Sequence, residues 1–432
     1  AALHKQLQTV IQPAMDKQVR ETSTLFIDTE KEEVDKIIRR AMRNSARFRN
    51  LKKDGVSEKD IYASFERKCN MKVFTFAGER DTLLTPKDSI LHHKRIMRAA
   101  FVAMEPQTGH VKAYVGGPSF QYFKYDMAKQ GKRQIGSTVK PFIYTFAIDQ
   151  LGLTPCTTVP NLPVSIETPA GIWSPKEAGK VEYDGVLHPL YWGLANSRNN
   201  YSAWIMKHAK RPEAVADFIH DIGIKSYIDP VVSLVLGSYD SNPYEMASAY
   251  CTFANEGVRI DPIFVTRIED SQGNVLATFT PKTNDVLSKR VAYTMITMMQ
   301  RVVTEGTARR MIYEFGFNDV EMAAKTGTTN DNVDTWFMCA VPNLVMGVWV
   351  GGEEPSVHFT SSADGSRMAL PVAGKFLTKV YNDGTLGVLR TDRFERSAEL
   401  PDYNCDGSSS SGEEMLGAND TSTSASDDEF FD

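Results

Sequence analysis

Over the first fifty residues, apolar positions recur every three or four residues, which is the spacing of one face of an α-helix. A first stripe predicts a helix kinked at Pro13, because proline has no backbone N–H to donate; its members are Leu3, Leu7, Val10, Ile11, Met15 and Val19. A second stripe consists of Val34, Ile37, Ile38, Ala41 and Phe48. It is interleaved with Lys36, Arg39, Arg40, Arg43, Arg47 and Arg49. We interpret this basic face as solvated, with contact to anionic lipid head groups or another anionic partner as the alternative.

From about residue 97 the pattern becomes strand-like. Two β-rich runs, AAFVAMEP and HVKAYVGG, flank the turn Gln107-Thr108-Gly109 and predict a hairpin. Residues 140–255 are mostly helical, NVLATFTP suggests a strand, and VLSKRVAYTMITMMQRVVTEG predicts a long helix with a Met and Val core stripe. The runs VEMAAKTGTT, WFMCAV and LVMGVWV then predict three strands in succession. This order indicates an α+β domain in which the early hairpin joins the late strands in one mostly antiparallel sheet.

The longest uncharged stretch, 335–352, reaches the length of a membrane-spanning helix. The turn dipeptide Pro342-Asn343 divides it into two short limbs rich in β-forming residues. We therefore predict a buried hairpin here rather than a membrane helix, and a chain that is soluble as given.

Composition and charge exclude several classes of protein. The chain has 432 residues, 42% of them hydrophobic, which is ordinary for a globular protein. Residues 406–432 contain eight acidic residues and no Lys or Arg, so the total charge of −5 leaves the other residues at +3. Nothing in this balance calls for a nucleic-acid partner. The Ser- and Asp-rich tail, 396–432, is predicted to be disordered.

The cysteines and histidines predict neither a disulfide framework nor a metal site. The five cysteines are widely scattered, without a CxxC pair: Cys69, Cys156, Cys251, Cys339 and Cys405. The eight histidines show no metal-ligand spacing, and we expect neither a metal nor another cofactor.

A Ser–Lys pair is the first candidate for catalysis. Ser137 and Lys140 are three residues apart, so on a helix they share a face and the amine can reach the hydroxyl. A serine hydroxyl needs an adjacent base to become a strong nucleophile. Lysine can be that base only if burial or a second cation lowers its pKa from about 10.4. An SxxK motif alone is common by chance, so it predicts little without further evidence.

Two further motifs support a catalytic role for the Ser–Lys pair. Ser197-Arg198-Asn199 follows Ser137 by 60 residues, and Lys325-Thr326-Gly327 follows Ser197 by 128. Each pattern occurs once, and their order is that of active-site serine acyl transferases. Coincidence of all three in one structural domain is therefore a poor explanation.

With these motifs the sequence resembles the transpeptidase domain of class A (bifunctional) penicillin-binding proteins over about residues 97–395. The similarity extends through RQIGSTVKPFIYTFAID, LGSYDSNPYEMASAYCTFANEG, TEGTARRM and AAKTGTTNDNVDTWFMCAVPNLVMGVWVGG, and MEPQTGHVKAYVGG resembles the opening hairpin. The resemblance implies a penicillin-binding protein/serine β-lactamase-like α+β fold, with a mostly antiparallel five-stranded sheet, flanking helices and a helical subdomain. Residues 1–96 resemble the linker before that domain. The family's membrane helix and glycosyltransferase domain have no counterpart here, so we expect the chain to be part of a longer protein.

The chemistry of the motif residues suggests roles that agree with the family's assignments. Ser137 would attack the penultimate D-Ala carbonyl of a peptidoglycan stem peptide, Lys140 would take its proton, and Ser197 would relay a proton to the leaving amine. Asn199 would bind the substrate's peptide, and Lys325 would keep Lys140 neutral and attract the substrate's carboxylate. The hydroxyls of Thr326 and Thr328 would hold that carboxylate, while Gly327 would let the substrate lie alongside as an added strand. The backbone N–H groups of Ser137 and Thr328 would form an oxyanion hole. A β-lactam antibiotic would enter by the same route and stall as an acyl-enzyme.

Three functions remain open on the sequence. The first is a periplasmic-face D,D-transpeptidase, whose contact with the membrane is made only by a segment outside this chain. The second is a hydrolase with the same acyl-enzyme, either a D,D-carboxypeptidase or a serine β-lactamase. Arg198 stands where many serine β-lactamases have Asp, and we interpret the candidate deacylation base, Glu245, as structural. The third, a non-catalytic β-lactam sensor, lacks a signalling segment in this sequence.

Overall fold

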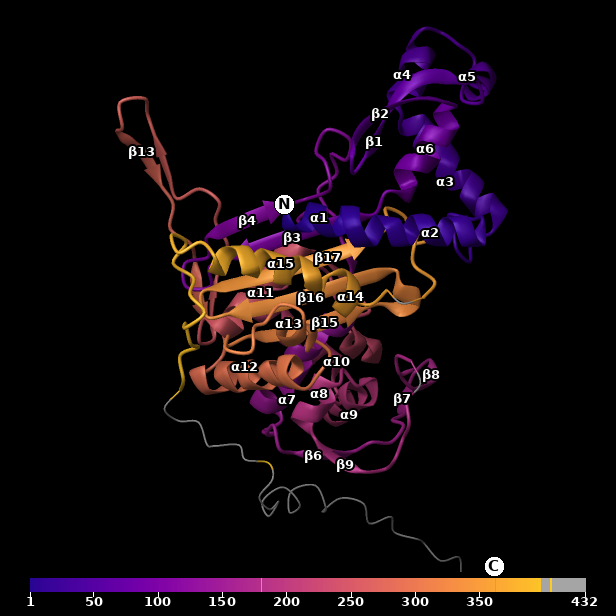
Figure 1. Ribbon diagram of the computed structural model, residues 1–432. Coiled ribbons are helices and arrows are strands. Elements are labelled where there is room, and N and C mark those ends of the chain that lie inside the picture. Colours follow the sequence, from indigo (N-terminus) through magenta and orange to yellow (C-terminus); the bar gives the residue numbers. More distant parts are fainter. Residues whose placement is uncertain (180, 362, 398–404, 406–432) are drawn as a thin grey trace, which may run out of the picture.

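The centre of the molecule is a five-stranded antiparallel sheet in the order β15-β16-β17-β3-β4. We describe a computed structural model that covers residues 1–179, 181–361, 363–397 and 405 (Figure 1). The strands are β3 (Arg98–Met104), β4 (Val111–Val115), β15 (Ala323–Thr328), β16 (Asp334–Val341) and β17 (Leu344–Gly351). The early hairpin therefore joins the late strands as predicted.

The three central strands are buried along their whole length on both faces. This explains the uncharged stretch 335–352, which forms the β16–β17 hairpin and not a membrane helix. None of the helices in the described part of the chain has the length and apolar character needed to span a bilayer.

Helices cover both faces of the sheet (Figure 1). One face is covered by α15 (Leu370–Tyr381) together with α1 (Ala2–Gln6), and α13 (Arg310–Tyr313) and α14 (Gly365–Met368) lie beside α15. The other is covered by α11 (Pro243–Ala254) and α12 (Lys289–Thr304). Behind α12 lies a helical subdomain of α7 (Lys140–Gln150), α8 (Leu190–Ala195), α9 (Asn199–Ala209) and α10 (Pro212–Ile222), with two single turns, η2 (Gly136–Val139) and η3 (Val232–Leu236).

Short strands make small two-stranded sheets outside the central one. In the subdomain these are β6 (Thr158–Pro160), β7 (Ile166–Thr168), β8 (Gly171–Trp173) and β9 (Leu187–Pro189). Just before η2 lies β5 (Arg133–Gln134), which pairs with β10 (Asp240–Ser241). Two more such sheets pair β11 (Val258–Ile260) with β14 (Thr283–Asp285) and β12 (Arg267–Glu269) with β13 (Val275–Thr278). The strand predicted at NVLATFTP is β13, which projects in a hairpin with β12 (Figure 1).

The N-terminal helix is continuous through Pro13 by way of a π-helical turn. It comprises α1, the π turn η1 (Leu7–Ile11) and α2 (Gln12–Thr22). Proline cannot donate to the preceding turn, and the wider π turn accommodates it. Leu3, Leu7, Ile11 and Met15 are buried as predicted, but Val10 is 41% exposed, because the π turn rotates the helix away from the expected register.

The rest of the N-terminal part is a small unit of helices with one hairpin. It contains α3 (Lys31–Asn44), α4 (Ala46–Lys53), α5 (Glu58–Ser64), β1 (Cys69–Thr75), β2 (Gly78–Leu84) and α6 (Pro86–Arg95). Several basic side chains of the second stripe bind within the chain: Arg40 pairs with Glu354, and Arg43 donates to the Tyr62 hydroxyl. The first contact joins the unit to the end of β17 and the second lies within the unit, so fewer basic groups of that face are free for an anionic partner.

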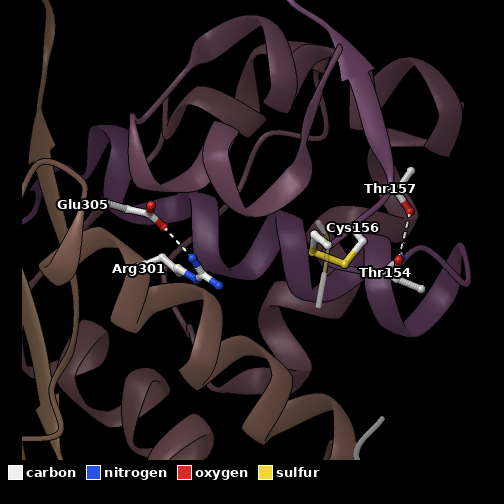
Figure 2. Close-up of a disulfide and its surroundings, with 6 residues drawn as sticks. Thr154, Cys156, Thr157, Arg301 and Glu305 are labelled. Atoms are coloured by element: carbon white, nitrogen blue, oxygen red, sulfur yellow. Dashed lines mark hydrogen bonds and ion pairs between the residues drawn. A yellow bond between two sulfur atoms is a disulfide. The ribbon is translucent and has the colours of Figure 1, made fainter. Parts of the chain in front are cut away.

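A disulfide joins Cys156, just beyond α7, to Cys405 (Figure 2). Our expectation of no disulfide framework was therefore wrong. The two cysteines are 249 residues apart in sequence but their Cα atoms are 5.1 Å apart, a proximity that only the tertiary fold creates and that spacing cannot reveal. The tail predicted to be disordered lies outside the described residues, except for Arg396, Ser397 and Cys405.

Candidate active site

The candidate nucleophile sits on a tight turn between the sheet and the first helix of the subdomain. Ser137 lies in the 3₁₀ turn η2, and Lys140 is the first residue of α7. In a 3₁₀ turn, side chains three residues apart lie one above the other, which brings both to one side of the chain. Gly136 has φ +54°, and a Cβ there would be 2.9 Å from the Thr328 carbonyl oxygen, so glycine allows the turn to press against β15.

Ser137 is partly exposed whereas Lys140 is fully buried. The Lys140 ammonium donates to the Ser197 carbonyl oxygen at 2.5 Å and to Asn199 Oδ1 at 2.7 Å. No hydrogen bond between the Ser137 hydroxyl and Lys140 is formed among the residues described. A neutral lysine that keeps these two donations has its lone pair left for the serine proton.

Ser197 lies between the two lysines. Its Oγ accepts from Lys325 Nζ at 2.8 Å and lies 3.3 Å from Lys140 Nζ. All three sequence motifs therefore meet at one hydroxyl. Ser197 and Lys325, which are in contact here, are 128 positions apart in the sequence.

The backbone of Ser197 is held in the left-handed conformation, with φ +55°. Its N–H donates to Leu194 O and that of Arg198 to Gly193 O, which is the Schellman pattern that ends a helix, here α8. Glycine is the usual residue at this position. The backbone of a serine here is therefore strained, and the surrounding structure holds it in place. The strained turn carries the hydroxyl that both lysines contact.

The β15 residues of the third motif are held by neighbours that the motifs do not contain. Thr326 Oγ1 lies 2.7 Å from Thr307 Oγ1, and Thr328 Oγ1 accepts from Gly365 N–H at 3.1 Å. A Cβ on Gly327 would be 2.8 Å from the Thr138 methyl group and 3.0 Å from Ile135 O. Glycine is thus required at 327 for packing of the nucleophile turn, a reason different from the substrate strand that we expected.

Asn199 is engaged at both ends of its amide. Its Oδ1 accepts from Lys140, and its Nδ2 donates to the Lys176 carbonyl oxygen at 2.7 Å. The adjacent Glu177 carboxylate accepts from the Asn199 and Asn200 backbone N–H groups. In this structure Asn199 therefore holds the lysine, whereas we expected it to bind the substrate's peptide. Lys176 and Glu177 were missed because no motif includes them. Thr307 lies in the segment TEGTARRM, which was noted for its resemblance but not as part of the site.

Burial sets the electrostatics of the two lysines. It lowers the pKa of Lys140 to about 7, although the Glu177 carboxylate opposes the shift and Arg198 adds to it. Burial and the charge of Lys140 hold the pKa of Lys325 well below its usual value. The two ammonium groups repel each other, so a charge on one lysine disfavours a charge on the other.

Glu245, the candidate deacylation base, faces a different region. Its carboxylate accepts from the Ser226 N–H and hydroxyl and from the Lys225 N–H, and Asn242 caps its helix through the Glu245 N–H. These contacts fasten a loop to α11 and confirm the structural interpretation. Within the described residues no three His, Cys, Asp or Glu side chains are grouped so that they could hold a metal ion.

The three motifs thus meet where the sheet joins the helical subdomain, with Lys140 and Lys325 buried and Ser137 and Ser197 partly exposed. Residues 99–377 match the penicillin binding protein transpeptidase domain, and residues 21–97 match the penicillin-binding protein middle domain. The chain therefore belongs to the penicillin-binding protein transpeptidase family.

Individual relatives agree with this assignment. The chain is 35% identical over 286 residues to penicillin-binding protein 1A of Neisseria lactamica and 33% identical over 293 residues to that of Aquifex aeolicus. These matches cover 64% and 66% of this chain but only 35% and 39% of the relatives. The crystal structure of penicillin-binding protein 1A from Haemophilus influenzae has a TM-score of 0.62 at 26% identity, over 67% of this chain and 48% of that one. The chain thus spans less than half the length of these relatives.

Proposed function

We propose that this chain is the D,D-transpeptidase part of a bifunctional peptidoglycan synthase, and that it works through a serine acyl-enzyme. The observation that carries the proposal is the meeting of Lys140 and Lys325 at the Ser197 hydroxyl, beside a partly exposed Ser137. The family match and the name of the 1A relatives support the substrate class, peptidoglycan stem peptides, and inhibition by β-lactams.

In the first half-reaction, Ser137 Oγ bonds to the carbonyl carbon of the penultimate D-Ala. Lys140 accepts the hydroxyl proton, and the oxyanion is stabilised by the N–H groups of Ser137 and Thr328. The C–N bond then breaks, and the terminal D-Ala leaves as an amine after taking a proton through Ser197. The hydroxyls of Thr326 and Thr328 and the amine of Lys325 hold the substrate's carboxylate. Gly327 has no Cβ, so the substrate can lie along the edge of the strand.

In the second half-reaction an amine from another stem peptide attacks the ester. Lys140 accepts the amine's proton and returns one to Ser137, which regenerates the free enzyme. If water attacked the peptidyl ester in place of the amine, the protein would be a D,D-carboxypeptidase. If water rapidly hydrolysed the ester formed with a β-lactam, it would be a β-lactamase. The candidate base for that water, Glu245, is bound to the loop at Ser226. Because it is engaged there, we expect hydrolysis of the acyl-enzyme to be slow.

The domain organisation and compartment are part of the same proposal. Residues 1–96 form the module before the transpeptidase at 97–395, and 396–432 form a tail. The Cys156–Cys405 disulfide supports an oxidising, extracytoplasmic location, because such bonds are rare in reducing cytosol. Membrane anchoring and glycosyl transfer would belong to segments outside this chain.

The experiment is an intact-mass measurement of the protein after mixing with penicillin, for the wild type and for Ser137→Ala. We expect a stable adduct on the wild type and none on the variant, with equal thermal stability. A well-folded Ser137→Ala protein that is still labelled would contradict the assignment. Release of D-Ala from a D-Ala-D-Ala peptide, with and without an acceptor amine, then separates transpeptidase from carboxypeptidase activity.

A further inference from the structure

Helix α9, which begins with Asn199, has no cap from its own residues. Its N-cap residue is Arg198, whose side chain makes no capping hydrogen bond. The first N–H groups of the helix donate instead to Glu177, 22 residues upstream: Asn199 N–H to Oε2 at 3.0 Å and Asn200 N–H to Oε1 at 2.8 Å. One carboxylate thus satisfies two backbone donors that every helix N-terminus leaves unpaired.

The same short loop fixes the direction of the Asn199 side chain. The Lys176 carbonyl oxygen can only accept, so it selects the NH₂ end of the amide, at 2.7 Å. The oxygen of the amide then faces Lys140 Nζ, also at 2.7 Å. An amide turned the other way would present a donor to the lysine and remove one of its two close acceptors.

Glu177 is also buried and lies beside a second cation. Its side chain is 6% exposed, and Oε1 lies 3.7 Å from Arg198 Nε. Arg198 in turn donates to Asn161 Oδ1 at 2.7 Å, which ties the second motif to the segment after β6. A buried carboxylate normally needs such partners, and here all of them belong to the turn that carries Ser197 and Asn199.

We propose that Glu177 is a positioning residue for acyl transfer: through α9 and the Lys176 carbonyl it holds Asn199 and Ser197 against Lys140. The proposal rests on the proposed function, because it assumes that Lys140 is the base. It assigns a role to a loop that none of the three motifs includes.

The charge of Glu177 also affects the pKa of Lys140. The charged groups that interact with Lys140 are Glu177 from the loop, Arg198 before α9 and Lys325 from β15. Of the tyrosines nearby, Tyr144 on α7 interacts with Glu177, and Tyr201 on α9 interacts with Arg198. Glu177 is the anion of this set, and it opposes the effect of burial on the pKa of Lys140. Removing its charge should therefore lower that pKa further.

The test measures the acylation rate constant with a fluorescent penicillin between about pH 5 and 10 for Glu177→Gln, Glu177→Asp and the control Glu182→Gln. Glu182 lies in the same segment, is exposed, and bonds to Asn161 only through its backbone carbonyl among the contacts described. For Glu177→Gln we expect the plateau rate to fall about 10-fold, since one helix N–H loses its acceptor and the site loosens. The acid limb should move down by about half a pH unit or more. Glu182→Gln should match the wild type.

The variants separate this role from a merely structural one. Glu177→Asp keeps the charge but is one methylene shorter, so its acid limb should stay in place while its plateau falls. A Glu177→Gln protein with the wild-type plateau and acid limb would overturn the proposal. If Glu177→Gln does not fold, a wild-type plateau in Glu177→Asp overturns it equally. Absence of labelling in the wild type, or labelling that survives Ser137→Ala, would instead overturn the proposed function on which it rests.

Discussion

Two clusters of buried cations lie in different parts of this molecule and have opposite surroundings. In the first, Lys94 at the end of α6 and Arg98 at the start of β3 bind the carboxylates that follow β17. Lys94 Nζ lies 3.1 Å from Glu353 and 2.6 Å from Glu354, and its side chain is 5% exposed. Burial raises the pKa of Glu353, but Lys94 and Arg98 outweigh it and the net pKa is lowered.

In the second cluster, Lys140 and Lys325 are buried among neutral oxygens. Their closest partners are the Ser197 hydroxyl, the Asn199 amide and backbone carbonyls. The Glu177 carboxylate only partly opposes the effect of burial there, and the pKa of Lys140 is lowered to about 7. Burial beside carboxylates thus gives a permanent ion cluster that joins two parts of the chain. Burial beside neutral oxygens gives a base that can give up its proton near neutral pH.

Replacing the base while keeping its charge should give the largest effect. Lys140→Arg retains a cation, but a guanidinium cannot be deprotonated in this pH range. We expect the acylation rate by penicillin to fall by about 10³-fold or more at every pH from about 6 to 10. Acylation that persists at high pH in Lys140→Arg would show that another group takes the serine proton.

The neighbouring lysine should instead move the pH dependence. In the wild type, acylation should decline as the pH falls through about 7, because protonated Lys140 cannot accept a proton. Lys325→Ala removes the like charge, so the pKa of Lys140 should rise and the acid limb should move up, by about one pH unit. Lys325→Arg keeps a cation, and its acylation should persist at a reduced rate. An unmoved acid limb in Lys325→Ala would leave Lys325 only the role of binding the substrate's carboxylate.

The paired cluster should respond in stability and not in chemistry. Lys94→Met leaves two carboxylates with one partner fewer, at a cost of about 3 kcal/mol. We expect a thermal midpoint lower by about 5 °C, measured by circular dichroism. The acid limb of acylation should be unchanged. A shifted acid limb in Lys94→Met would mean that the two clusters are coupled, and the contrast between them would be lost.

The sequence predicted most about the candidate site where its residues lie in short motifs. SxxK, SxN and KTG single out Ser137, Lys140, Ser197 and Lys325 because each motif lies within a few neighbouring residues, and continuous apolar runs rich in β-forming residues predict the sheet. Contacts between distant segments left no such pattern. Glu177 reaches α9 from a loop, and Cys156 meets Cys405 through the fold alone.

Some local details also depend on tertiary structure. The π turn before Pro13 changes which residues face inward, and so exposes Val10. Ser197 adopts a left-handed backbone conformation, with positive φ, that its neighbours in the sequence do not predict. The Cys405 link also bears on the tail. A chain cut before Cys405 loses a covalent tie to the subdomain, so we expect truncation to leave thermal stability unchanged only when the cut lies after this residue.

The central claim is that Ser137 is the acylated nucleophile of a site whose base is Lys140. The most direct measurement is peptide mapping of the penicillin adduct by tandem mass spectrometry after brief labelling at about pH 8. The account predicts a single adduct on the peptide that contains Ser137, at the serine oxygen. An adduct on any other residue, or an unmodified Ser137 in protein that has fully bound the antibiotic, would contradict it.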